Sequence, residues 1–410
     1  MKRLLSGFLF CVLFSGNLYA ENYQPVWFVS SEEKDATESS IGETPMVQVA
    51  EGDESVVIFN KQRFASRLRD VGIARNWLIN EFDTNKMQNI IVSPLSFYEA
   101  AVLLANGVVD ETLIEFSNLF SVLKLSDVGL SLHNYLSQKE ESIFINLSLW
   151  GSVFTEKYGK MMEQQLNAEV WGIKDSTASV NDWAKARTQG VIEKIAPVES
   201  VAKDELFIGS IAFYKNSMKI PFAAHDNLFH AFDGKNIQTT VLSAKHEVNY
   251  FEDDEKQAIQ IECNHNDFIT ILLPRENVDF KDFVKDLTMY NLLPEFDKHA
   301  VVDISLPVID FEYNAKATGK VFESFNINRI FTQQNNEFAK MVSFDDEVYV
   351  KNLYMHAKVN ISADNDADMT EDFSKLKAKY TFNANRPFVF IINHGDFIGT
   401  FVQPSIKQSL

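Results

Sequence analysis

The chain has little cysteine, which excludes a fold held together by several disulfide bonds. Its 410 residues contain two cysteines, Cys11 and Cys263, and Cys11 lies in an N-terminal segment with the pattern of a signal sequence. Cleavage of that segment would leave Cys263 alone, so no intrachain disulfide could form and the core must supply the stability. A dimer bridged through Cys263 stays open as an alternative, but the sequence predicts a monomer.

Long hydrophobic runs are lacking at the N-terminus, where a membrane anchor would need about 20 apolar residues. The apolar run Leu4–Phe14 is shorter, follows Lys2 and Arg3, and precedes a small residue, Ala20. This pattern predicts a secretory signal peptide over residues 1–20. We therefore expect a secreted protein, extracellular or, in a bacterium, periplasmic, with no membrane insertion.

Positive charge is scarce. The 38 Lys and Arg residues face 57 Asp and Glu residues, which gives a net charge of −19. Loss of residues 1–20 removes Lys2, Arg3 and no acid, and so moves the charge to −21. A chain this acidic is a poor partner for nucleic acid or an anionic membrane.

Residues 21–55 are acidic and turn-rich. This composition predicts a flexible leader outside the fold, with a propeptide or a partner-binding tail as alternatives.

Common catalytic motifs are also missing. The sequence contains no glycine-rich phosphate loop, no Gly-x-Ser-x-Gly elbow and no His-Glu-x-x-His pair. Cys263, His265 and Asp267 crowd one predicted turn, but neighbours on a tight turn point apart and no second His or Cys lies at ligand spacing. We expect no enzyme activity, no catalytic residue, no metal site and no cofactor.

Apolar residues, in contrast, are abundant enough for a large core: they make up 46% of the chain and include 34 Phe. No linker or repeat divides residues 60–405, so residues 56–408 are predicted to form one mixed α+β domain. The apolar spacing predicts a helix ending near Phe82. A short strand then leads to Ser93 as N-cap of a helix that is apolar on nearly every face.

Alternating and continuous apolar runs predict most of the strands. The predicted strands are residues 144–150, 206–214, 257–263, 268–274, 349–361 and 386–392, and a further helix is predicted at 180–192, closed by Gly190. Between the last two strands lies a charged, turn-prone stretch of residues 362–379. A long loop between two buried strands is uncommon in a compact domain, and such loops are usually functional or disordered. This loop is the candidate working part of the chain.

Short motifs occur in a fixed order from Phe64 to Pro404. They are Ile91-Val92-Ser93-Pro94-Leu95-Ser96, Val180-Asn181-Asp182-Trp183, Thr188-Gln189-Gly190-Val191-Ile192, Phe213-Tyr214-Lys215, Pro221-Phe222, Leu272-Leu273-Pro274, Leu306-Pro307, Tyr313, Val321-Phe322, Ile327 to Phe331, His356 and Asn385-Arg386-Pro387-Phe388-Val389-Phe390. In this order the chain resembles the serpin family, the serine protease inhibitors.

The resemblance implies three β-sheets, about eight or nine helices and an exposed reactive loop at residues 364 to about 381. In inhibitory serpins a protease cuts this loop, which then inserts as a new strand into the largest sheet and distorts the acyl-enzyme that it carries. Stored strain and new main-chain pairing drive such an insertion. The implied partner is a serine-type protease.

Insertion requires alternation along the loop, because one side of the new strand faces the core. One face of the inserted strand would carry Ala363, Asn365, Ala367, Met369, Glu371 and Phe373. The opposite face would be wholly polar and would carry Asp364, Asp366, Asp368, Thr370, Asp372 and Ser374. The predicted hinge residues are Asp364, Asp366, Ala367, Met369 and Glu371. Burying Glu371 without a partner would cost several kcal/mol, and Asp366 stands near a position where the inhibitory pattern has Gly. A solvated acidic loop explains the alternation equally well.

If the loop is a bait, the resemblance places the scissile bond within Lys375 to Thr381. Lys375, Lys377 and Lys379 suit a trypsin-like S1 pocket that carries an Asp, whereas Leu376 and Tyr380 suit a chymotrypsin-like one. The lysines could also serve solubility alone, so this choice stays open.

The resemblance also implies a buried polar cluster, the shutter, beneath the central strands. Its predicted members are Ser93, Ser96, Ser210 and His356, with Ser210 in place of an expected Asn. Met218 stands where a Trp is usual at the top of the sheet. By a small margin these departures favour a non-inhibitory binding or carrier role, and the alternative is an irreversible serine or cysteine endopeptidase inhibitor.

Overall fold

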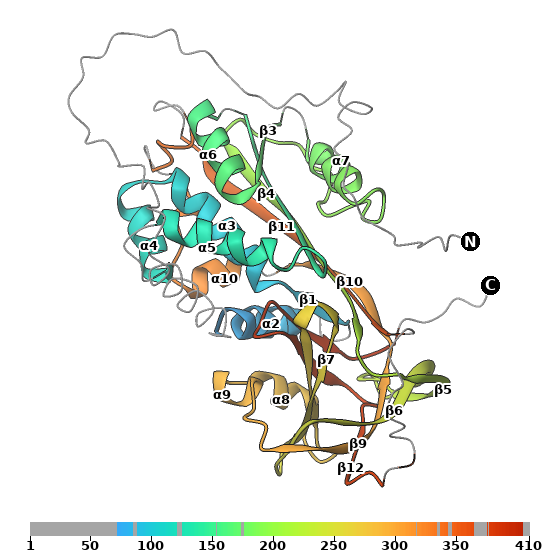
Figure 1. Cartoon of the computed structure of the whole chain (residues 1–410). Helices are drawn as coiled ribbons and strands as arrows, with labels where there is room; N and C mark the ends of the chain where they lie inside the picture. The colour runs from blue at the N-terminus through green and yellow to red at the C-terminus, as the bar shows by residue number, and fades with distance from the viewer. Residues whose placement is uncertain are drawn as a thin grey trace, which may run out of the picture.

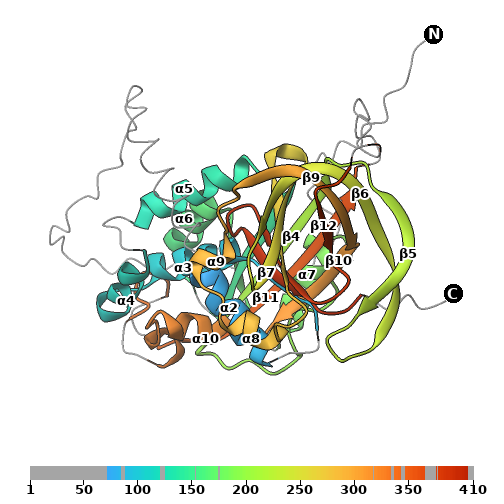
Figure 2. The same cartoon turned by 90° about the horizontal axis from the view of Figure 1, so that it is seen from below.

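The computed structural model describes residues 72–84, 88–120, 125–152, 154–173, 176–316, 318–333, 337–342, 347–364, 375 and 377–404. The predicted signal peptide and leader, residues 1–20 and 21–55, lie outside the described residues, as does the start of the helix predicted to end near Phe82. The described chain folds into two sheets flanked by helices (Figures 1 and 2).

Helices dominate the first half of the described chain. They are α2 (Gly72–Thr84), α3 (Pro94–Gly107), α4 (Asp110–Phe120), α5 (Leu125–Ser137), α6 (Glu156–Leu166), α7 (Ala178–Arg187), α8 (Phe280–Lys285), α9 (Met289–Leu292) and α10 (Thr318–Ser324), with 3-10 turns η1 (Asn264–Asn266) and η2 (Arg329–Phe331).

Strands dominate the second half. They are β1 (Ile90–Val92), β2 (Ile143–Gly151), β3 (Glu169–Gly172), β4 (Glu205–Met218), β5 (Ala223–His230), β6 (Asn236–Glu252), β7 (Lys256–Glu262), β8 (Phe268–Pro274), β9 (Lys298–Pro307), β10 (Ile309–Ala315), β11 (Tyr349–Ala363), β12 (Tyr380–Asn383), β13 (Phe388–Ile392) and β14 (Phe397–Phe401). The α+β class predicted from the sequence is confirmed.

A five-stranded sheet in the order β10-β11-β4-β2-β3 forms the centre of the molecule. Figure 1 shows α3, α5 and α6 on one side of this sheet and α7 on the other. The side chains agree, because Leu206 and Ile208 of β4 belong to the same core as α3, whereas Phe207 belongs to a second core with Val180 and Trp183 of α7. Strand β4 is therefore covered on both faces, which explains its continuous apolar sequence.

The remaining strands form one nine-stranded sheet, so the prediction of three sheets is wrong in that detail for the described residues. The cause is strand β6, which is 17 residues long. Residues 236–243 of β6 pair with β5, residues 241–250 pair with β9, and residues 249–252 pair with β7. Because one continuous strand takes part in all these ladders, two expected sheets are hydrogen-bonded into one.

Helix α3 begins as the sequence predicts. Ser93 is its N-cap and accepts a hydrogen bond from the backbone N–H of Ser96, with Pro94 in the first helical turn. The side chains of Leu95, Phe97 and every residue from Ala100 to Leu104 are buried. The helix is thus a central element of the core, and it holds Ser93 under the five-stranded sheet.

Helix α7 ends earlier than predicted. It stops at Arg187 instead of continuing to Ile192. The Thr188 hydroxyl donates to the carbonyl of Ala184 and accepts from the N–H of Ile192, which diverts the chain into a turn. Gly190 has a φ of +84° in this turn, a conformation that favours glycine.

Candidate functional site

The central pair of strands, β4 and β11, runs parallel with no strand between them. Their register extends from Glu205 opposite Tyr349 to Met218 opposite Ala363. The loop predicted from the sequence leaves β11 at this last pair. A loop that turned back from Ala363 into the sheet would therefore run antiparallel to both neighbours, and antiparallel pairing is slightly more stable per residue than parallel pairing.

The far end of the loop returns to the nine-stranded sheet. Lys379 donates its backbone N–H to the carbonyl of Val301 at 2.9 Å, and β12 then pairs with β9. Tyr380 is the first residue of β12, and its ring stacks on Tyr250 with centroids 4.3 Å apart. The two ends of the loop are thus attached to different sheets.

The structure describes only part of the predicted bait and hinge. Lys375, Lys377 and Lys379 are exposed, whereas Tyr380 is half-buried. Asp364 is half-buried at the end of β11. The other predicted residues, Asp366, Ala367, Met369, Glu371 and Leu376, lie outside the described residues. Their roles, like the position of the scissile bond, stay predictions.

Polar contacts close the top of the β4–β11 pair. The hydroxyls of Ser217 and Ser362 are hydrogen-bonded at 2.8 Å. The backbone N–H of Asp364 donates to the carbonyl of Met218 at 3.1 Å. Asn264 Nδ2 in turn donates to Asp364 Oδ2, also at 3.1 Å. Together these contacts hold the first residue of the loop beside the end of β4.

A second set of contacts closes the other end of the pair. Lys351 of β11 forms an ion pair with Glu205 of β4, and the Tyr349 hydroxyl donates to Glu205 Oε1 at 3.2 Å. Across the described residues between these two ends, no side-chain hydrogen bond joins β4 to β11. The middle of the pair is held by its backbone ladder and by apolar packing, such as Phe207 stacked on Tyr354 with centroids 6.0 Å apart.

The predicted shutter residues are all buried, but they do not form one connected cluster. Ser93, Ser96 and His356 line a cavity of about 10 Å³. Ser210 does not line this cavity, and it pairs in register with Met355. The hydroxyls of Ser96 and Ser210 have no hydrogen-bond partner within the described part of the chain.

His356 is hydrogen-bonded away from β4. Its Nδ1 lies 2.8 Å from Asn314 Oδ1 on β10, so Nδ1 carries the hydrogen and Nε2 is left as an acceptor. Glu312 Oε2 lies 3.7 Å from Nε2, too far for a hydrogen bond. Burial, followed by the charge of Lys358, lowers the pKa of His356 to about 4. The ring is therefore neutral at neutral pH and fastens β11 to β10.

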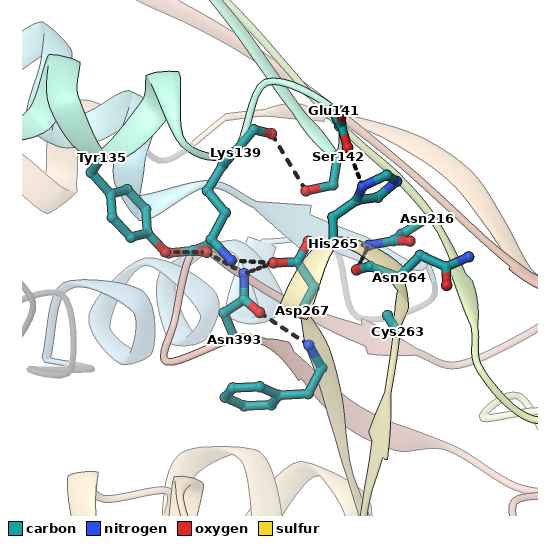
Figure 3. A network of polar contacts seen from close by, with 12 residues as sticks. Tyr135, Lys139, Glu141, Ser142, Asn216, Cys263, Asn264, His265, Asp267 and Asn393 are labelled. Atoms are coloured by element: carbon teal, nitrogen blue, oxygen red, sulfur yellow. Dashed lines mark hydrogen bonds and ion pairs between the residues drawn. The ribbon is translucent and has the colours of Figure 1, made fainter. Parts of the chain in front are cut away.

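The sequence analysis did not predict the buried polar network at the turn Asn264–Asp267. Cys263 is a buried thiol whose pKa is raised to about 12 by burial. His265 pairs with Glu141 and Asp267 with Lys139, so the three side chains diverge and form no joint site. Asp267 instead belongs to a buried polar network that reaches Asn264 at the loop base (Figure 3). One sequence feature could have indicated this network: an acidic residue in a predicted hairpin turn needs polar partners if it is buried.

Neither a metal site nor a membrane span is evident in the described part of the chain. None of its helices combines the length and apolar character needed to cross a membrane. No group of three or more His, Cys, Asp and Glu side chains among the same residues could hold a metal ion.

The parallel neighbours β4 and β11 thus lie at the centre of one sheet, and the chain after β11 returns to the other sheet at β12. The family model "Serpin (serine protease inhibitor)" matches residues 77–404. The chain therefore belongs to the serpin family, and serpins are not enzymes.

Individual relatives are distant. An uncharacterized serpin-like protein of Methanosarcina mazei is 23% identical over 338 residues, which cover 75% of this chain and 79% of the relative. Human antithrombin-III is 22% identical over 364 residues, with 79% and 78% covered. The native stressed conformation of Arabidopsis AtSerpin1 matches with a TM-score of 0.73 at 16% identity, covering 84% of this chain and 98% of that one. This structural likeness supports the fold.

Proposed function

We propose that this serpin is a secreted, irreversible inhibitor of a trypsin-like serine endopeptidase, with the loop from Asp364 to Thr381 as its bait. One observation carries the proposal: β4 and β11 are joined by side-chain hydrogen bonds only near their two ends within the described residues. A strand entering from the Ala363 end must break few side-chain contacts, and it gains antiparallel neighbours on both sides. The signal pattern at residues 1–20 supports secretion.

The lysines favour a trypsin-like target over a chymotrypsin-like one. Lys375 and Lys377 are exposed and lie before the return into β12, whereas Tyr380 is paired in that strand and stacked on Tyr250. The protease serine would attack the carbonyl carbon of the scissile lysine, and the C–N bond would break as the leaving amine takes up a proton. Insertion of the loop would then carry the resulting ester away before water could cleave it.

Substitution of the loop lysines tests this proposal. We expect wild-type protein mixed with trypsin to give an adduct that survives SDS, with its ester at one of the three lysines. Among Lys375→Ala, Lys377→Ala and Lys379→Ala, one variant should lose at least about 90% of the adduct, because an Ala side chain cannot pair with the Asp of the S1 pocket. The other two variants are matched controls. Cleavage of the wild-type loop with no adduct would contradict inhibition.

A second candidate function is partner binding without inhibition. The acidic residues favour it, because Glu371 lies on the face that insertion would bury and Asp366 replaces the expected Gly. In that case the loop would behave as an ordinary substrate of every protease that reaches it.

A further inference from the structure

The base of the loop is held by a turn from the other sheet. Asn264, the first residue of η1, donates from Nδ2 to Asp364 Oδ2 at 3.1 Å. Both residues are half-buried, and Asn264 is one of the hydrogen-bond partners of Asp364. A hydrogen bond to a charged group is stronger than one between neutral groups, so this single contact is significant for the position of the loop base.

Buried groups hold Asn264 in place. Asn216 of β4 donates from Nδ2 to the carbonyl oxygen of Asn264 at 2.9 Å and to Asp267 Oδ2 at 3.1 Å. Asn216 and Asp267 are only 6% and 2% exposed. The turn therefore cannot shift without disturbing a buried carboxylate, which is costly unless new partners replace the old ones.

From Asp267 the polar contacts continue into the core (Figure 3). Its other oxygen, Oδ1, accepts from Lys139 Nζ and from Asn393 Nδ2, the latter at 3.0 Å. Asn393 Nδ2 also donates to Asp396 Oδ2 at 2.6 Å. The hydroxyl of Tyr135 on α5 lies 2.7 and 2.8 Å from the two oxygens of Asp396. Two buried carboxylates are thus bridged by one amide.

The chain of contacts ends at the shutter. Ser93 Oγ, at the N-cap of α3, donates to the carbonyl oxygen of Asp396 at 3.3 Å. The pKa of Asp396 is raised to about 6, because burial outweighs the hydrogen bonds from Asn393 and Tyr135. Asp396 therefore depends on these donors to stay ionised at neutral pH.

We propose that Asp364, Asn264, Asn216, Asp267, Asn393, Asp396 and Ser93, with Tyr135 as a side branch, form a relay that couples the loop base to the shutter. Asn264 and Tyr135 are positioning residues in this relay: Asn264 holds the loop base, and Tyr135 holds Asp396. Only the consequence for loop insertion rests on the proposed function. The relay itself controls how often the loop base separates from β4 in the intact protein.

A double-mutant cycle on hydrogen exchange tests the relay. The amide N–H of Asp364 donates to the carbonyl of Met218, so its exchange rate reports opening of the loop base. We expect Asn264→Ala to speed this exchange about tenfold, since it removes a charge-assisted hydrogen bond. Tyr135→Phe should speed it about threefold from a distance. If the relay couples them, the double variant should exchange at least about threefold more slowly than the product of the two effects predicts.

Ser217→Ala is the matched control, because it removes the contact of Ser217 with Ser362 at the same loop base without altering a relay side chain. Its effect should multiply with that of Tyr135→Phe. The relay is refuted if Tyr135→Phe leaves the exchange of Asp364 unchanged, or if its effect multiplies with that of Asn264→Ala. No protease is used, so failure of the proposed inhibition would show separately as cleavage without adduct.

Discussion

Trypsin cleavage of the loop between Lys375 and Lys379 is expected to raise the thermal midpoint of the protein by roughly 15 °C. The reason is the topology of the central sheet. A loop that inserts between β4 and β11 exchanges one parallel ladder for two antiparallel ones, a gain of about ten main-chain hydrogen bonds at about 1 kcal/mol each. In a domain of this size each kcal/mol corresponds to between about 1 and 2 °C.

Differential scanning calorimetry before and after limited trypsin treatment measures this rise. A variant with Lys375→Ala, Lys377→Ala and Lys379→Ala combined is the control, because trypsin can no longer cut the loop there. Identical midpoints for cut and uncut wild-type protein would mean that the loop stays outside the sheet.

The second large effect is expected at Glu371. Insertion with the predicted face inward buries this side chain, whereas the adjacent Asp372 faces outward. An unpaired buried carboxylate costs several kcal/mol, so Glu371→Ala should increase the ratio of trypsin adduct to cleaved product at least about tenfold. The amounts of adduct and cleaved product can be read from a denaturing gel over a range of molar ratios of inhibitor to protease.

Asp372→Ala is the matched control for that substitution. It removes the same charge from the next position of the loop, and it should leave the ratio within about twofold, as surface changes usually do. Equal effects of the two substitutions would show that total charge, rather than the facing of the inserted strand, governs the reaction.

Local patterns were sufficient to predict the elements around the site. The continuous apolar run of β4 indicated a strand covered on both faces, and Ser93-Pro94 marked the start of α3. The turn between β7 and β8 was likewise evident from the polar residues between two apolar runs. These features depend on residues within a few positions of one another, so the sequence contains them directly.

Contacts between distant segments could not be predicted in the same way. The bond from Asn264 to Asp364 joins residues 100 positions apart, and that from Asn393 to Asp267 spans 126. The joining of two expected sheets depends on which strands β6 meets along its length. Such pairings follow from the whole fold, and the hydrophobic pattern of β6 does not contain them.

The shutter residues show both a feature that the local sequence indicates and a contact that only the fold reveals. Burial of Ser93 and Ser96 followed from the apolar helix that Ser93 caps, whereas burial of His356 was implied only by the family resemblance, and all three residues are buried. The partner of His356, however, is Asn314 on β10, which no local pattern marked. The substitution at Ser210 could be noticed in the sequence, but its consequence, the absence of a polar link from β4 to His356 among the described residues, required the fold.

Insertion of the loop requires β4 and β11 to separate, and a disulfide across the pair would prevent this separation. Lys215 and Asn360 are partners in register, so Lys215→Cys and Asn360→Cys would place two thiols on strands about 4.8 Å apart. The only other cysteine predicted in the mature chain, Cys263, is buried. An inserted strand would move the two positions to about 10 Å, beyond the reach of a disulfide.

The measurement is the yield of SDS-stable trypsin adduct from this double variant with its disulfide formed and after reduction. We predict cleavage without adduct in the oxidised form and recovery of the adduct in the reduced form. Equal adduct in both forms would contradict inhibition by strand insertion, because the loop would then trap the protease without opening the sheet.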